Sequence, residues 1–136
     1  MENNHINLRS GIPISIALGL NNTTWTNMPA AETEFAATYS TRTAIDVKHA
    51  RLARLVTRLN AAAAANAKLK LQYAVTEGGT YTDLCSVILG ATTGVKVGGW
   101  TDVPAAAQKD VFIRVVGIDG DGVADPTFIL INLQLV

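Results

Sequence analysis

A chain of 136 residues is long enough to bury a hydrophobic core without disulfides or a structural metal, and we expect one domain plus an arm. Eleven basic and eleven acidic residues leave no net charge, which excludes a general electrostatic attraction to nucleic acid or to an anionic membrane. The only cysteine, Cys85, excludes an intrachain disulfide and a cysteine-based zinc site, and its apolar run predicts a small buried side chain.

Residues 1–31 differ from the rest of the chain, because they are rich in Asn and Thr and almost uncharged after Glu2. Apolar residues with the period-two spacing of a half-buried strand occur there at Ile12, Ile14, Ile16, Leu18 and Leu20. Pro13 restricts this stretch to a strand start or a sheet edge. The pattern fits the first strand of a sandwich, and nearly as well an extended arm that lies on another subunit. We therefore divide the chain into residues 1–31, an N-terminal arm or edge-strand segment, and residues 32–136, a β-sandwich domain.

The stretch Arg51–Asn60 alternates between two kinds of side chain. One set is apolar or small, at Ala53, Leu55, Thr57 and Leu59, and the other set is Arg54, Val56 and Arg58. This alternation predicts a strand with a core face and a basic face. A helix over Ala44–Ala67 is the alternative, because alanine is the best helix former, but β-branched residues and the alternation fit it poorly.

The next stretch, Lys68–Val75, alternates again and predicts a strand followed by a hairpin. The expected inward residues are Leu69, Leu71, Tyr73 and Val75, and the expected outward residues are Lys68, Lys70, Gln72 and Ala74. Glu77–Thr80 contains two glycines and predicts the hairpin turn, after which the chain returns from Tyr81. Gly94–Trp100 predicts another short strand. Short strands with turn signals at intervals of about 8 to 12 residues indicate an all-β antiparallel β-sandwich of the jelly-roll type.

Two apolar runs of strand length dominate the last third, at Val111–Ile118 and Phe128–Leu135. Their β-branched and aromatic residues favour strands over helices. The linker between them contains Asp119–Gly122, which tolerates positive φ, and Asp125–Pro126, which favours an extended entry into the second run. We expect the two runs to pair with each other as the antiparallel centre of the core.

Residues for catalysis or metal binding do not form a recognisable pattern in this sequence. His5 and His49 have no metal-ligand spacing, no serine or cysteine lies in a nucleophile elbow, and no glycines form a phosphate loop. We therefore expect no enzyme, cofactor or metal ion.

Asp119, Asp121 and Asp125 resemble a calcium loop, but Val123 and Leu130 occupy the fifth and twelfth positions, where an EF-hand needs oxygen ligands. We interpret these residues as a turn selected for backbone conformation, and a cation site of another type stays open.

Charge is distributed unevenly along the chain. The middle is basic, with Arg42, Lys48, Arg51, Arg54, Arg58, Lys68 and Lys70, whereas six aspartates from Asp83 to Asp125 make the C-terminal part acidic. Solvated strand faces explain this distribution, and so does complementary charge between neighbouring copies in an assembly. A nucleic-acid site is disfavoured because no aromatic residues interleave the basic stretch.

The segments Leu69–Leu84 and Gly99–Pro126 resemble jelly-roll domains of tailed-bacteriophage structural proteins. In such domains a YS-DGG-TW-DL hairpin is followed by a W-x-x-[IV]-P strand entry, a strand that ends R-V-V-G, and a terminal strand. Here the entry is Trp100–Pro104 and the strand ends at Arg114–Gly117, whereas Glu77 and Tyr81 replace the hairpin's Asp and Trp. The resemblance covers about the C-terminal half of the chain.

This resemblance implies a capsid decoration (cement) protein, which binds the outside of an assembled head, commonly as a homotrimer, and ties subunits of the major capsid protein together. The expected location is the virion surface, after assembly in the host cytoplasm, since the sequence contains no signal peptide and no membrane-spanning run. The expected interface residues are Ile12, Ile14, Ile16 and Leu18 between subunits, and Arg51, Arg54 and Arg58 against an acidic partner surface. The alternative is a receptor- or carbohydrate-binding domain of a tail fibre or baseplate, in which Trp100 is exposed for binding rather than packed.

Overall fold

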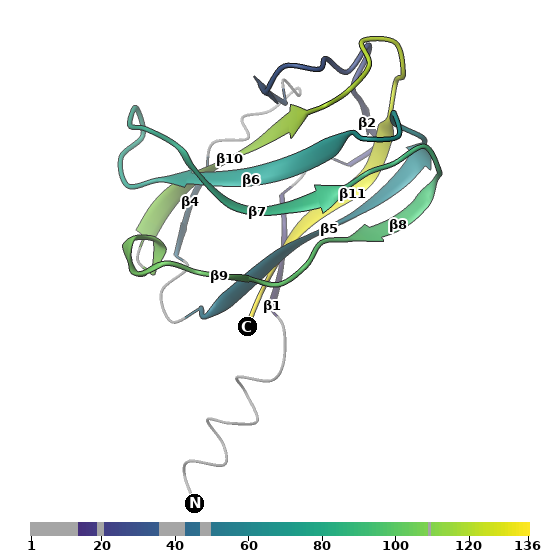
Figure 1. Ribbon diagram of the computed structural model, residues 1–136. Coiled ribbons are helices and arrows are strands. Elements are labelled where there is room, and N and C mark those ends of the chain that lie inside the picture. The colour runs from purple at the N-terminus through teal and green to yellow at the C-terminus, as the bar shows by residue number, and fades with distance from the viewer. Residues whose placement is uncertain (1–13, 19–20, 36–42, 47–49, 109) are drawn as a thin grey trace, which may run out of the picture.

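The computed structural model describes residues 14–18, 21–35, 43–46, 50–108 and 110–136, which fold into two antiparallel sheets packed face to face (Figure 1). Sheet A contains β1 (Ile14–Ala17), β2 (Thr23–Thr24), β5 (Leu52–Ala61), β8 (Gly94–Val97), β9 (Thr101–Asp102) and β11 (Thr127–Leu135). Sheet B contains β3 (Thr33–Glu34), β4 (Thr43–Asp46), β6 (Lys68–Ala74), β7 (Thr82–Ile88) and β10 (Asp110–Ile118). A short 3-10 turn at Ala105–Ala107 precedes β10. The predicted all-β antiparallel sandwich is confirmed.

The order of the strands is that of a jelly roll. In sheet A the order is β1-β11-β5-β8, and in sheet B β10 lies between β6 and the short strands β3 and β4, with β7 on the far side of β6. Each sheet therefore interleaves strands from the beginning and the end of the chain, as in a double Greek key. Most contacts are consequently long-range, and neither sheet forms from a single local segment.

The expected pairing of the two C-terminal strands is wrong. β10 pairs with β6, and β11 pairs with β5, so the two apolar runs lie in opposite sheets and face each other across the core. The linker that joins them is too long for a tight hairpin, and it crosses from one sheet to the other (yellow-green, top of Figure 1). The amides of Asp119 and Gly120 donate to the carbonyls of Ala30 and Pro29, at 2.9 and 3.0 Å, which anchors the linker. A side chain at Gly120 would clash with the Met28 carbonyl, so this close approach requires glycine.

β5 confirms the predicted strand, and the alternative helix over residues 44–67 is wrong. Its inward side chains Ala53, Leu55, Thr57 and Leu59 are buried. Thr57 is the polar member of this set, and its hydroxyl donates to the Leu130 carbonyl at 2.7 Å. Burial of that hydroxyl therefore leaves its hydrogen bond satisfied.

The β6–β7 hairpin is confirmed, but the prediction of its faces is partly wrong. Gln72 and Ala74, expected to be exposed, are 4% and 2% exposed, whereas Val75, expected to be buried, is 51% exposed. The strand ends at Ala74, so Val75 belongs to the loop. The pairing of β6 with β7 shifts its register between Leu71 and Gln72, and neighbouring polar side chains cover Gln72.

The core is filled by side chains from both sheets. Phe35 stacks on Trp25 with ring centroids 4.4 Å apart, and it contacts Phe128 at 5.1 Å. Cys85 is buried as predicted, and burial raises the pKa of its thiol to about 12, so the group stays protonated and apolar. These contacts pack the two sheets against each other and leave their outer faces for other interactions.

Candidate interaction surface

The predicted N-terminal interface residues lie at one edge of sheet A. β1 pairs with β11, which places Ile14 opposite Leu135 and Ile16 opposite Leu133. Because residues opposite each other share a face, this apolar row points towards the core. Ile16 and Leu18 pack against the core, whereas Ile14 is 65% exposed. Ile12 lies outside the described residues, and a contact of this segment with another subunit stays a prediction.

The predicted cations Arg54 and Arg58 lie on the outer face of sheet A. Thr57 points into the core, so its neighbours on β5 point outward. The register pairs Arg58 with Val95 and Val56 with Val97 of β8, so these side chains form one row on the outer face. Arg51 precedes β5, and its exposed side chain lies outside this row. We name the surface formed by Arg54, Val56, Arg58, Val95, Val97 and Trp100 the outer patch.

Apolar side chains of the outer patch are open to solvent. Val95 and Val97 are 63% and 53% exposed, and Trp100 is 37% exposed. Arg54 covers one face of the Trp100 ring, with its guanidinium carbon 4.3 Å from the ring centroid. Its Nε donates to Gln134 Oε1 at 2.7 Å, which fixes the guanidinium over the ring. The sequence left Trp100 either packed or exposed, and the structure shows a half-exposed ring with one covered face.

The outer face of sheet B contains the same arrangement of an arginine, a glutamine and an aromatic ring. Arg114 lies 4.3 Å from the centroid of the Tyr81 ring, and its Nε donates to Gln72 Oε1 at 2.8 Å. Here two carboxylates complete the cluster. Gln72 Nε2 donates to Glu32 at 3.0 Å and to Asp83 at 2.8 Å.

Lys70 joins the same two carboxylates, at 3.0 Å from Glu32 and 3.1 Å from Asp83. Hydrogen bonds from Lys70 and Gln72 hold the pKa of Glu32 below its usual value. Hydrogen bonds from Gln72 and Lys70 likewise lower the pKa of Asp83, and the bonds to both carboxylates raise the pKa of Lys70. The charges of this face are therefore compensated within the chain.

The outer patch has no such compensation. Within the described parts of the chain, neither Arg54 nor Arg58 forms an ion pair with a carboxylate. Two cations therefore lie beside exposed valines on the outer face of sheet A. A surface of this composition is typical of a contact with another macromolecule.

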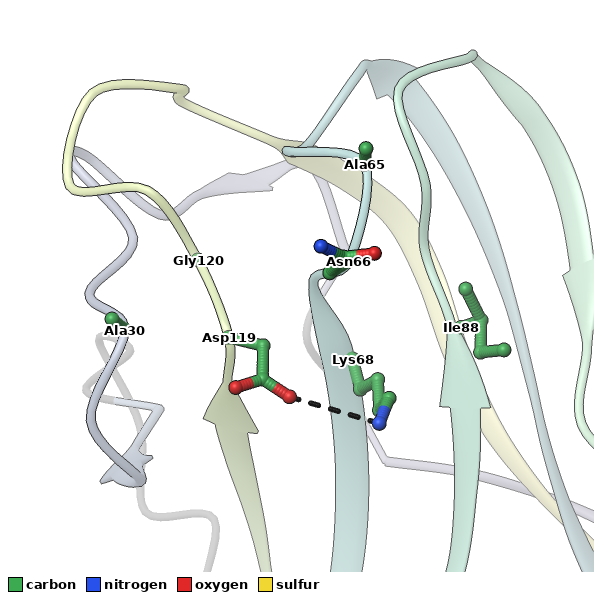
Figure 2. A pocket seen from close by; sticks show the side chains of 7 residues that line it. All are labelled: Ala30, Ala65, Asn66, Lys68, Ile88, Asp119 and Gly120. Atoms are coloured by element: carbon green, nitrogen blue, oxygen red, sulfur yellow. Dashed lines mark ion pairs between the residues drawn. The ribbon is translucent and has the colours of Figure 1, made fainter.

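An open pocket of about 540 Å³ lies at one end of sheet B (Figure 2). Its lining residues are Ala30, Ala65, Asn66, Lys68, Ile88, Asp119 and Gly120. Lys68 and Asp119 form an ion pair at 3.6 Å across it, and both side chains are more than 40% exposed. The pocket is open to solvent, and Lys68 and Asp119 are the charged residues of its lining.

The aspartates of the β10–β11 linker bond to backbone amides. Asp121 Oδ1 accepts from the amides of Val123 and Ala124, both at 2.9 Å, and Asp125 Oδ1 accepts from the amide of Asn27 at 2.7 Å. Asp119 and Gly122 have φ of 62° and 74°. These features fit the predicted turn. Across the described residues, no three His, Cys, Asp or Glu side chains are grouped to hold a metal ion.

Comparison with known proteins does not assign this fold to a family. No protein-family model matches the chain, and no curated protein matches it. No helix within the described ranges is long and apolar enough to cross a membrane. The arrangement of residues on the two outer faces is therefore the main guide to function.

Proposed function

We propose that this chain is a viral structural protein, a decoration protein of a tailed-phage head, which acts as a homotrimer and contacts the major capsid protein. The observation that carries the proposal is the outer patch, where Arg54 and Arg58 lie beside exposed Val95 and Val97 without a carboxylate partner among the described residues. A contact that combines cations with exposed apolar side chains suits a protein that assembles with other protein subunits.

Two further features support this function. The jelly-roll order of the strands agrees with the class of domain that the sequence resembles, although fold alone does not define function. The N-terminal segment leads into β1, the edge strand of sheet A among the described residues, and an extended segment at a sheet edge is able to add a strand to a neighbour.

Immunogold labelling of intact virions with antibodies against this chain tests the proposal. Label distributed over the heads is the expected result. Label confined to tails or fibres, or no label on virions, would contradict it.

A deletion of residues 1–13 tests the contribution of the N-terminal segment, because it spares β1 and its contacts with the core. We expect this variant to fold and to lose binding to empty heads in a co-sedimentation assay. Undiminished binding would exclude a role of residues 1–13 in attachment.

A receptor- or carbohydrate-binding domain of a tail fibre or baseplate is the second candidate. Trp100 favours it, because a half-exposed indole beside an arginine is able to stack on a sugar ring. This function predicts a specific signal on a glycan array that Trp100→Ala abolishes. Binding that Trp100→Ala leaves intact, or no signal at all, would exclude Trp100 as a sugar platform.

A further inference from the structure

The linker between β10 and β11 presents an apolar side chain between two carboxylates. Val123 is 73% exposed, and Asp121 and Asp125 flank it in the sequence. Both carboxylates use Oδ1 for backbone hydrogen bonds. The amide of Gly122 donates to the Met28 carbonyl at 2.8 Å, and this bond holds the linker against the connection between β2 and β3. The acidic linker, residues 119–125, is therefore a preformed surface.

The outer patch has the complementary composition. Its exposed centre is apolar, at Val95 and Val97, and its charges are the cations Arg54 and Arg58. In the corresponding cluster on sheet B, two carboxylates bond to the glutamine that accepts from the arginine. The outer patch lacks carboxylates in this role among the described residues. The acidic linker carries two carboxylates, Asp121 and Asp125, on either side of the exposed Val123. The chain as a whole has no net charge, so its basic and acidic surfaces are able to neutralise each other between copies.

We infer that the acidic linker of one copy docks on the outer patch of a second copy. Val123 packs against Val95 and Val97, and Asp121 and Asp125 lie beside Arg54 and Arg58. This inference rests on the proposed function and deepens it. It assigns the outer patch to the contact between copies of the decorating homotrimer, and the trimer contacts the major capsid protein through another surface.

The two surfaces differ, so the contact is heterologous. Each copy offers a linker to one neighbour and an outer patch to another. A heterologous contact closes into a ring when the rotation between copies permits it, and three copies would give the predicted homotrimer.

Sedimentation velocity of the full chain over a wide range of concentrations tests the inference. We expect reversible association of the wild-type chain. Arg58→Glu, which loses no ion pair within the described chain, and Val123→Lys each place like charges opposite each other and raise the concentration for half-association by about tenfold or more. The double variant Arg58→Glu/Asp125→Lys exchanges two opposed charges, and we expect it to associate more tightly than Arg58→Glu alone.

Val75→Lys is the matched control, because it places the same substitution on an exposed loop valine away from both surfaces, and we expect it to associate like the wild type. Circular dichroism checks that every variant is folded. A wild-type chain that stays monomeric at all concentrations would overturn the inference. So would single variants that associate normally, or a double variant that associates no more tightly than Arg58→Glu.

The outcome is separable from that of the proposed function. Virion heads that carry immunogold label, together with a wild-type chain that never self-associates, would retain the decoration role and reject this contact. Self-association with the predicted charge reversal and no label on virions would retain this contact and reject the decoration role.

Discussion

The outer faces of the two sheets carry the same trio of side chains in different surroundings. On sheet B, Gln72 of the trio Arg114, Gln72 and Tyr81 also bonds to Glu32 and Asp83. On sheet A, no carboxylate among the described residues bonds to Arg54, Gln134 or Trp100. Each arginine lies at nearly the same distances from its ring and its glutamine. The two faces differ in the carboxylates that bond to the glutamine on sheet B. A face that satisfies its own charges stabilises the fold, whereas a face that leaves them unpaired is suited to bind a partner.

The largest difference in the free energy of unfolding is expected between alanine variants of the two glutamines, Gln72 and Gln134. Gln72→Ala removes a buried amide that bonds to two carboxylates and an arginine, and we expect it to lower the free energy of unfolding by about 2–3 kcal/mol. Gln134→Ala removes one bond at a half-buried site and should cost less than about 1 kcal/mol. Urea denaturation of both variants measures the difference, and equal losses would show that the two trios are energetically equivalent.

Acid should lower the stability of the folded chain through the two carboxylates on sheet B, Glu32 and Asp83. The pKa values of Glu32 and Asp83 are lowered in the folded chain, so the unfolded chain binds protons first as the pH falls. Their contribution to stability is complete above the unfolded pKa values, 4.5 and 3.8, and is lost as the pH falls through the lower folded values.

The raised pKa of Lys70 has the opposite effect on stability. Its contribution is complete below the unfolded pKa of 10.5 and is lost only in strong alkali, as the pH rises through the folded pKa. Asp121, whose pKa is also lowered, titrates in the acid range as well. The acid dependence of the wild type alone therefore does not isolate Glu32 and Asp83. We compare thermal unfolding of the wild type and of Glu32→Gln/Asp83→Asn between about pH 3 and pH 7. This variant should show a shallower acid dependence than the wild type, and an unchanged dependence would contradict the assignment to sheet B.

Exposed valines on sheet A should contribute little to folding. Val95→Ser/Val97→Ser is expected to change the free energy of unfolding by no more than about 0.5 kcal/mol per site, because both side chains are already more than half exposed. The same variant should weaken binding to virion heads or self-association. Ile88→Ser, on the outer face of sheet B and 63% exposed, is the control and should leave both properties unchanged.

The smallest effect is expected at the open end of sheet B. Lys68→Met breaks an ion pair of 3.6 Å between two half-exposed side chains, and we expect less than about 0.5 kcal/mol in urea denaturation. A larger loss would show that the ion pair drawn in Figure 2 stabilises the fold more than a half-exposed pair is expected to.

The strands of this fold were largely predictable, because one buried face imposes period-two alternation. β5 and β6 follow that pattern, and the two glycines at Gly78 and Gly79 marked the hairpin after β6. The partners of the C-terminal strands were not predictable from alternation, which carries no information about which sheet a strand joins. The long linker with its aspartates was the signal that β10 and β11 are not a simple hairpin.

The interaction surface was predicted in part. Arg54 and Arg58 followed from the alternation of β5, whereas the exposed valines of β8 became apparent only once the register placed them beside those cations. The network around Gln72 was missed because Glu32, Asp83 and Arg114 come from three separate segments of the chain. No local sequence pattern could have joined them.

Hydroxyl-radical footprinting of Trp100 and Tyr81 tests most directly whether the outer patch is the contact surface. In each case the guanidinium carbon of an arginine lies 4.3 Å from the ring centroid. The oxidation of Trp100 therefore measures the accessibility of the sheet A face, and that of Tyr81 measures the accessibility of the sheet B face. Relative to the dilute free chain, the assembled virion should protect Trp100 from oxidation and leave Tyr81 unchanged. Protection of Tyr81 alone, or of neither ring, would contradict the assignment of the outer patch as the contact surface.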